Sequence, residues 1–175
     1  MSTTPPVRSP DLDRLNALSG PELEAAFLKC CGARRWAESM VQAAPFADAD
    51  ALFAAAEAAF ATLDAADWLE AFAHHPRIGD VSRLRERFAA SGALSEKEQG
   101  SAMATATEAV IQRLFARNQA YEARHGHIFI VCATGKSAPE MLDLLEARID
   151  LELDRETANC ATEQRKITAL RLGAI

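Results

Sequence analysis

Two consecutive histidines mark the stretch of this sequence that is best suited to acid–base chemistry. They lie in residues 73–80, which read A-H-H-P-R-I-G-D and close a long alanine-rich run. The residue before a proline is pushed out of the helical region, so His75 is expected where the backbone leaves a helix. Imidazole has an unperturbed pKa of roughly 6.5, close to neutral pH. His75 is therefore a candidate acid or base that the chain fixes but helix neighbours leave uncovered.

A carboxylate at an expected helix start is the second candidate. Ser95 and Glu98 match the S-x-x-E capping box, in which each side chain bonds a backbone N–H group of the same first turn. Taken alone, this pattern favours a capping role for Glu98. A carboxylate at a helix N-terminus is also held in place and kept ionised, so the same geometry could serve a substrate. Both roles remain open.

Arg171 is the third candidate, near the end of the last expected helix. It shares a helix face with Cys160, Gln164 and Ile167, at spacings of four, three and four residues. An arginine on such an apolar stripe is less easily explained by solvation than one on a charged face. It is either a cation favourably placed at a helix C-terminus or a ligand contact, and the pattern does not choose between them.

Thr134-Gly135-Lys136-Ser137 superficially matches a phosphate-binding loop. That motif requires a glycine five positions before Gly135, where this sequence has Ile130. The match therefore fails, and the residues predict a turn at Gly135 followed by a helix cap at Ser137. Exposed backbone N–H groups in such a turn could still hold a small polar ligand.

Neither the four histidines nor the four cysteines form a metal-binding pattern. The sequence contains no H-E-x-x-H and no C-x-x-C, and Cys30 and Cys31 are adjacent. We expect no metal, no cofactor and no disulfide framework, and we interpret the cysteines as small buried hydrophobes in a reducing compartment. Arg34 and Arg35, beside Trp36, could form an anion site, but the pattern favours a solvated helix start with a packed ring.

Length and charge limit the class of protein. A chain of 175 residues suits one domain, and we expect residues 10–175 to form it behind a flexible arm at residues 1–9. The net charge of -6 argues against a nucleic-acid partner. The first residues do not resemble a secretory signal, and no apolar run is long enough to span a membrane. A cytoplasmic location is therefore expected.

The elements that must position the candidates are helices. Alanine-rich residues 48–63 and 64–75 lead to the histidines, a long helix opens at Ser95 and ends near His125, and further helices cover 138–151 and 154–172. Residues 127–133 have strand-like composition but no partner strand, so we expect extended buried chain or a minimal ladder. The predicted fold is an all-α, single-domain bundle of about eight helices with one short extended segment near 127–134.

Five segments in register resemble the 2-oxo-4-hydroxy-4-carboxy-5-ureidoimidazoline (OHCU) decarboxylase family. They are C-G-A-R-R-W at 31–36, H-P-R-I-G at 75–79, S-E-K-E-Q at 95–99, F-I-V-C-A-T-G-K-S-A at 129–138 and E-Q-R-K-I-T-A-L-R-L at 163–172. The resemblance covers the chain from about residue 20 to its end. It implies an all-α, cofactor-free enzyme, usually a homodimer, that converts a small ureide carboxylate in urate breakdown to (S)-allantoin and carbon dioxide.

The resemblance also implies a set of site residues. The histidine before the proline, His75, would be the catalytic acid, and Glu98 would assist it. The residues that would contact the substrate are Pro76, Ser95, Glu98, Gln99, Phe129, Ile130, Val131, Cys132, Ala133 and Arg171. Two alternatives remain: a non-catalytic helical interaction module, and an enzyme that acts on a different ureide.

Overall fold

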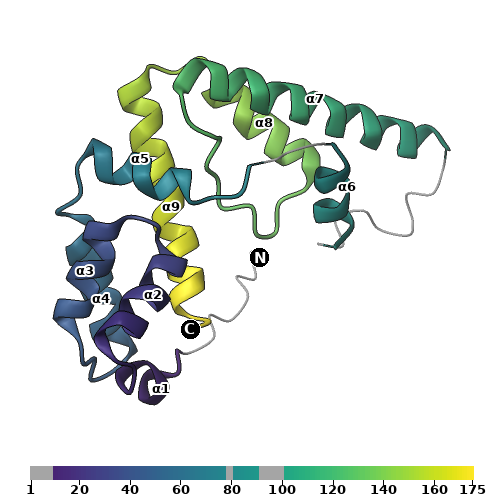
Figure 1. Ribbon diagram of the computed structural model, residues 1–175. Coiled ribbons are helices and arrows are strands. Elements are labelled where there is room, and N and C mark those ends of the chain that lie inside the picture. Colours follow the sequence, from purple (N-terminus) through teal and green to yellow (C-terminus); the bar gives the residue numbers. More distant parts are fainter. Residues whose placement is uncertain (1–9, 78–80, 91–100) are drawn as a thin grey trace. The chain divides into compact units, whose positions relative to one another are not determined.

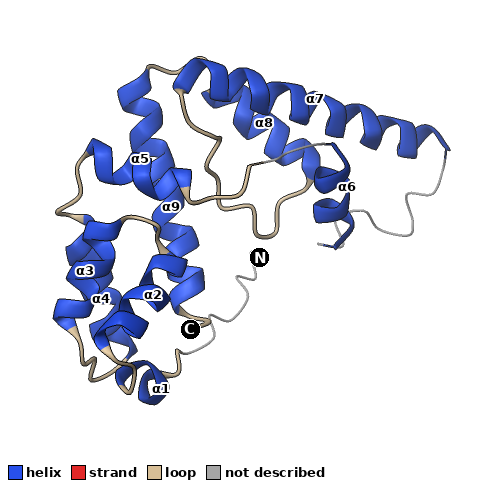
Figure 2. Cartoon of the chain, viewed as in Figure 1, coloured by secondary structure: helices blue, strands red, loops and turns tan. Residues whose placement is uncertain are grey.

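The computed structural model describes residues 10–77, 81–90 and 101–175. Within these residues the regular structure is entirely helical, with nine helices and no strand (Figures 1 and 2). The helices are α1 (Leu12–Asn16), α2 (Gly20–Cys30), α3 (Arg34–Ala43), α4 (Ala49–Phe60), α5 (Ala65–Ala73), α6 (Val81–Ala90), α7 (Ser101–His125), α8 (Ala138–Arg148) and α9 (Leu153–Leu172). The predicted all-α class is confirmed.

The chain divides into two compact units. We call Met1–His75 with Asn159–Ile175 the terminal unit, and Pro76–Ala158 the central unit. Helix α9 starts in the central unit and continues in the terminal unit. The expectation that residues 10–175 act as one domain stays a prediction.

In the terminal unit, polar caps begin the helices and aromatic rings pack them together. The Asp64 side chain accepts from the backbone N–H groups of Ala66 at 2.9 Å and Asp67 at 3.2 Å, which starts α5. The Trp36 ring stacks on Phe60 with centroids 5.3 Å apart, and its Nε1 donates to the carbonyl of Ala56 at 3.2 Å. These contacts tie α3 to α4 and help fix the unit that carries α5.

The two arginines at the start of α3 are paired with acidic side chains of α5. Arg35 lies 3.2 Å from Asp67, and the backbone N–H of Arg34 donates to Glu70 at 3.0 Å. The same residues, with Glu38, line a shallow surface depression. Because its carboxylates already balance its guanidinium groups, this surface is a solvated helix start and not an anion site, and the predicted burial of Trp36 is confirmed.

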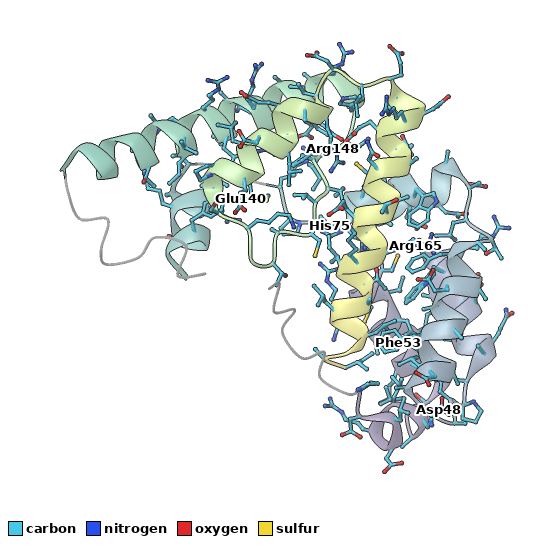
Figure 3. The ribbon with its side chains drawn as sticks, turned by 180° about the vertical axis from the view of Figure 1, so that it is seen from behind. Asp48, Phe53, His75, Glu140, Arg148 and Arg165 are labelled. Atoms are coloured by element: carbon cyan, nitrogen blue, oxygen red, sulfur yellow. The ribbon has the colours of Figure 1, made fainter. Side chains whose placement is uncertain are left out.

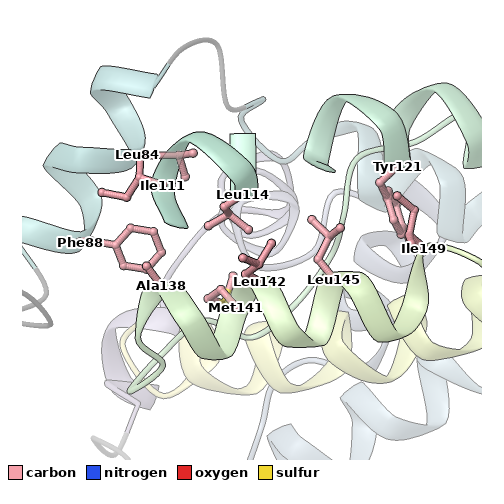
Figure 4. Close-up of a cluster of buried hydrophobic side chains, with 10 residues drawn as sticks. All are labelled: Leu84, Phe88, Ile111, Leu114, Tyr121, Ala138, Met141, Leu142, Leu145 and Ile149. Atoms are coloured by element: carbon pink, nitrogen blue, oxygen red, sulfur yellow. The ribbon is translucent and has the colours of Figure 1, made fainter. Parts of the chain in front are cut away.

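The central unit is built on a separate apolar core, which α6, α7 and α8 share (Figure 4). Its buried side chains are Leu84, Phe88, Ile111, Leu114, Tyr121, Ala138, Met141, Leu142, Leu145 and Ile149. Ser137 caps α8, since its Oγ accepts from the backbone N–H of Glu140 at 3.4 Å and its own backbone N–H donates to the Glu140 carboxylate at 2.7 Å. The predicted cap at Ser137 is therefore confirmed.

Between α7 and α8 the chain runs extended through residues 127–133 without a strand partner in the described residues. Gly126 ends α7 with a φ of 77°, a left-handed conformation that glycine adopts most easily. Gly135 has a φ of 75° in the turn where the Lys136 N–H donates to the carbonyl of Ala133 at 3.1 Å. The predicted extended segment and turn are confirmed, whereas the predicted helix start at Ser95 lies outside the described residues.

No helix in the described ranges has the length and apolar character needed to cross a bilayer.

Candidate functional site

His75 occupies the position that the His-Pro pair predicts. Helix α5 ends at Ala73, and the backbone N–H of His75 still donates to the carbonyl of Phe72 at 3.2 Å before the chain turns away at Pro76. The half-buried ring points toward α9, where its Nε2 lies 2.5 Å from Oε1 of Gln164 (Figure 3). A short bond to a buried amide therefore fixes the ring of the candidate acid.

Gln164 is held in turn by Thr168, one turn further along α9. Both side chains are fully buried. The amide Nε2 of Gln164 donates to the Thr168 hydroxyl at 3.2 Å, and that hydroxyl lies 2.9 Å from the backbone carbonyl of Gln164 and 3.3 Å from that of Cys30. We call His75, Gln164 and Thr168 the histidine relay. It joins the end of α5 to α9 and to the end of α2.

Gly32 packs closely against His74, the first residue of the histidine pair. A Cβ atom added at Gly32 would lie 2.3 Å from both Cβ and Cγ of His74. Real Cβ atoms do not approach so closely, so the close packing of the loop after α2 against the end of α5 depends on glycine at this position. Gly32 belongs to the C-G-A-R-R-W segment that resembles the family.

Arg171 binds the end of α2. Its Nη1 donates to the carbonyls of Lys29 at 3.3 Å and Cys30 at 3.1 Å, and these two carbonyls are its hydrogen-bond partners among the described residues. Carbonyls in a last helical turn lack partners in their own helix, so a cation is favourable there. Arg171 follows Gln164 by seven residues, about 10 Å along the helix axis. Its role as a ligand contact stays a prediction.

The buried cysteines beside Arg171 are not reactive groups. Burial raises the pKa of the Cys30 thiol to about 11, an effect that the nearby Arg171 charge only partly offsets. Burial raises the pKa of Cys31 to about 11 in the same way. Both thiols are protonated at neutral pH, and all four cysteines are buried without a disulfide. This agrees with their interpretation as small hydrophobes.

The predicted substrate-contacting segment, residues 129–133, is held in the central unit by two cations. Nη1 of Arg148 donates to the carbonyl of Ile130 at 3.1 Å, and its guanidinium lies 4.6 Å from the centroid of the Phe129 ring. Nζ of Lys136 donates to the carbonyl of Cys132 at 2.8 Å. Within the described chain, the backbone N–H groups of residues 129, 130, 131 and 133 have no hydrogen-bond acceptor. Donors of this kind suit an anionic ligand.

Arg148 is itself fixed by a buried carboxylate. Its Nε and Nη2 donate to Glu156 at 3.0 Å and 2.6 Å, and the Tyr121 hydroxyl also donates to that carboxylate. The Glu156 side chain is 0% exposed and that of Arg148 is 11% exposed. We call Arg148, Glu156 and Tyr121 the charged cluster. It ties α7, α8 and α9 to the extended segment.

Of the other predicted site residues, the structure describes Pro76. Pro76 is exposed at the start of the central unit. The structure does not describe Ser95, Glu98 and Gln99. Whether Glu98 caps a helix or serves a substrate therefore stays a prediction. No group of three or more histidine, cysteine, aspartate or glutamate side chains in the described chain could hold a metal ion.

Sequence reasoning missed the residues that hold the candidates. Gln164 shares a helix face with Arg171, but no role was predicted for it from the sequence. The usable signal was the pair Gln164 and Thr168, two polar residues four positions apart in this part of the helix. Arg148 and Glu156 carry no local signal, because the charges meet only when α8 and α9 fold together.

The sequence profile of the OHCU decarboxylase family matches residues 16–173. The chain is 35% identical over 148 residues to the uric acid degradation bifunctional protein TTL of Arabidopsis thaliana, which covers 83% of this chain but only 45% of that longer protein.

Two solved structures are also similar. A crystal structure of OHCU decarboxylase in the presence of (S)-allantoin is 30% identical, with a TM-score of 0.64 over 85% of this chain and 94% of that one. A crystal structure of (S)-allantoin synthase is 19% identical and shares the fold, with a TM-score of 0.65 over 92% of this chain and 52% of that one. The profile match over nearly all of its length shows that this chain belongs to the OHCU decarboxylase family.

Proposed function

We propose that this protein decarboxylates OHCU to (S)-allantoin and carbon dioxide in urate breakdown. The observation that carries the proposal is the placement of His75, which the family resemblance makes the catalytic acid, at the end of α5 against the buried amide of Gln164. Family membership across residues 16–173 supports it. So does the similarity to a solved OHCU decarboxylase with (S)-allantoin.

The proposed reaction has two steps. The bond between the ring carbon and the carboxylate breaks, carbon dioxide leaves, and the bonding electron pair passes into the conjugated system of the substrate ring. His75 then delivers a proton to the ring carbon from one face, and the electron pair forms the new C–H bond. Delivery from one face fixes the hand of the product, and a positioned acid typically contributes roughly a hundred- to ten-thousandfold in rate.

Negative charge that develops during the first step needs donors aimed at it. We assign this role to backbone N–H groups of the segment 129–133, of which those of residues 129, 130, 131 and 133 have no acceptor in the described chain, and to Arg171, of which only Nη1 has a described partner. Pro76, Ser95, Glu98 and Gln99 complete the proposed substrate contacts. Glu98 would bond the substrate hydroxyl or ureido groups.

We further propose that residues 10–175 work as one domain, in a cytoplasmic homodimer. Light scattering of the purified chain during size-exclusion chromatography measures the mass directly. A mass twice that of the 18.9 kDa chain is expected, and a monomer at assay concentration would contradict the dimer.

The activity is tested by producing the unstable substrate in place from urate with the two preceding enzymes. Circular dichroism then follows the optical activity of allantoin as this protein is added. The matched variants are His75→Ala and His74→Ala, which remove neighbouring imidazoles from the same turn. Of the two, His75 is the one whose hydrogen bond to Gln164 the structure describes.

We expect prompt (S)-allantoin from the wild type and from His74→Ala, and only the slow racemic background from His75→Ala. Helical circular dichroism of each variant controls for folding. A racemic background with the wild type would refute the proposed activity. A different product, identified by mass spectrometry, would assign the protein to another ureide.

A further inference from the structure

The hydrogen bonds of the histidine relay have a direction that can be traced from Thr168. Its hydroxyl lies 2.9 Å from the backbone carbonyl of Gln164 and 3.3 Å from that of Cys30. Carbonyl oxygens only accept, so the hydroxyl proton points to the carbonyl side, as is usual for threonine bonding back to the preceding helical turn. The lone pairs of the hydroxyl are then left for Gln164.

The side-chain amide of Gln164 must therefore present its N–H group to Thr168, at the observed 3.2 Å. Its oxygen consequently faces His75, at 2.5 Å from the ring Nε2. That oxygen has no proton to give, so the His75 nitrogen that faces it has to be the donor. Because Gln164 and Thr168 are fully buried, water does not compete for the bond between them.

We propose that Gln164 and Thr168 are positioning residues that keep a proton on Nε2 of His75, so that Nδ1 is the nitrogen that releases and regains the catalytic proton. The part that concerns catalysis rests on the proposed function. In the protonation step the Nδ1–H bond breaks, its electron pair stays on Nδ1, and the proton joins the substrate carbon. The product is a neutral imidazole with its proton on Nε2, which a proton from solvent restores to the acid form.

This arrangement matters because an unconstrained imidazole exchanges between two neutral tautomers. Only one of them leaves Nδ1 ready to take up the next proton. Holding the Nε2–H bond against a buried acceptor also fixes the plane of the ring, and hence the direction from which the proton reaches the substrate. The histidine relay thus orients the His75 ring, and other groups determine the charge of the site.

The test is nitrogen NMR of the protein labelled with ¹⁵N-histidine, at a pH where the ring of His75 is neutral. The His75→Ala variant identifies the signals. Three further variants are compared with the wild type: Gln164→Met, which removes the acceptor; Thr168→Val, which removes the hydroxyl at nearly the same shape; and Thr168→Ser, which keeps the hydroxyl.

We expect the wild type and Thr168→Ser to show a single tautomer with a slowly exchanging proton on Nε2. Gln164→Met and Thr168→Val should lose the slow exchange and show both tautomers. A proton on Nδ1 in the wild type would overturn the proposal, because it would require the reverse orientation of the amide. An unchanged single tautomer in Gln164→Met would overturn it too, because Gln164 would then not set the tautomer.

Turnover supplies the second measurement. In the allantoin assay we expect Thr168→Val to lose severalfold in kcat with KM nearly unchanged, and Thr168→Ser to stay near the wild type. Full kcat in a Thr168→Val protein with mixed tautomers would refute the role given to Nδ1. A wild type without turnover would refute the proposed function and with it the role of Nδ1, but the NMR result would still decide the tautomer.

Discussion

His75 is held by a side chain of α9 and the segment 129–133 by a side chain of α8, and the two groups differ in character. In the terminal unit, the neutral amide of Gln164 and the hydroxyl of Thr168 hold an imidazole. In the central unit, the ionised pair Arg148 and Glu156 holds a backbone carbonyl. The neutral groups orient a proton, whereas the charged groups fix a stretch of main chain.

Because of this contrast, the two regions should depend to different degrees on a single side chain. A buried neutral group that loses its partner costs about 1–3 kcal/mol, the penalty for leaving one donor or acceptor unsatisfied. A buried ion that loses its partner costs about 3–5 kcal/mol, because an uncompensated charge remains away from water. The charged cluster should therefore dominate stability and the relay should dominate function.

The largest expected effect is that of Arg148→Ala. It removes the guanidinium group that pairs with the fully buried Glu156 carboxylate, so we expect a loss of about 3–5 kcal/mol in the free energy of unfolding. Urea denaturation followed by circular dichroism measures it. The control is Arg113→Ala, which breaks an ion pair with Glu146 whose arginine is 60% exposed. That change should cost less than about 1 kcal/mol, and equal costs for the two variants would abolish the contrast.

The second effect is that of Thr168→Val, which leaves an N–H of the buried Gln164 amide without its acceptor. We expect about 1–3 kcal/mol by the same denaturation measurement. Thr168→Ser keeps the hydroxyl and isolates that loss from the loss of a methyl group. A cost for Thr168→Val as large as that of Arg148→Ala would show that the neutral relay is no less critical to stability than the charged cluster.

The third prediction replaces the whole charged cluster by apolar groups, with Arg148→Met, Glu156→Leu and Tyr121→Phe combined. Since the buried charges are removed together, the free energy of unfolding should recover to within about 1–3 kcal/mol of the wild type, the cost of leaving the buried carbonyl of Ile130 without its donor. Turnover should not recover, because the carbonyl of Ile130 has lost its donor. Recovery of both would mean that the cluster serves stability alone.

The smallest expected effect concerns His127, which lies beside Tyr121 with ring centroids 5.7 Å apart. Burial lowers the pKa of His127, with the neighbouring His125 adding to the shift. A lowered folded-state pKa gives stability that is complete above the unfolded value of roughly 6.5 and is lost as pH falls toward the folded value. Thermal unfolding at pH 7.5 and pH 5.5 tests this. His127→Phe should narrow the difference between the two midpoints, and an equal difference in both proteins would remove His127 as its source.

The parts of the fold that could be predicted are those with local causes. Pro76 expels the preceding residue from a helix, and Ser137 and Glu140 cap one another within a single turn. The exit of the chain at His75, the start of α8 and the turn at Gly135 follow from neighbours in the sequence. The five segments that resemble the family, taken together, also predicted the all-α fold class.

The contacts that hold the candidates could not be predicted, because their partners are distant in sequence or on another helix. Gln164 meets His75 only when α9 packs on the end of α5, and the carbonyl of Ile130 meets Arg148 only after α8 has formed. The composition of residues 127–133 suited a strand, but β-propensity mainly reports fit to a half-buried surface, and cationic side chains hold this segment in place of a second strand.

The close approach of Gly32 to His74 has a consequence for how the sequence can change over evolutionary time. A side chain at residue 32 would collide with the Cβ atom of residue 74, which every amino acid except glycine possesses. No substitution among larger residues at 74 can relieve that collision. Among proteins that keep this packing, the two positions should therefore covary, with residue 32 free to drift away from glycine only where residue 74 has become one.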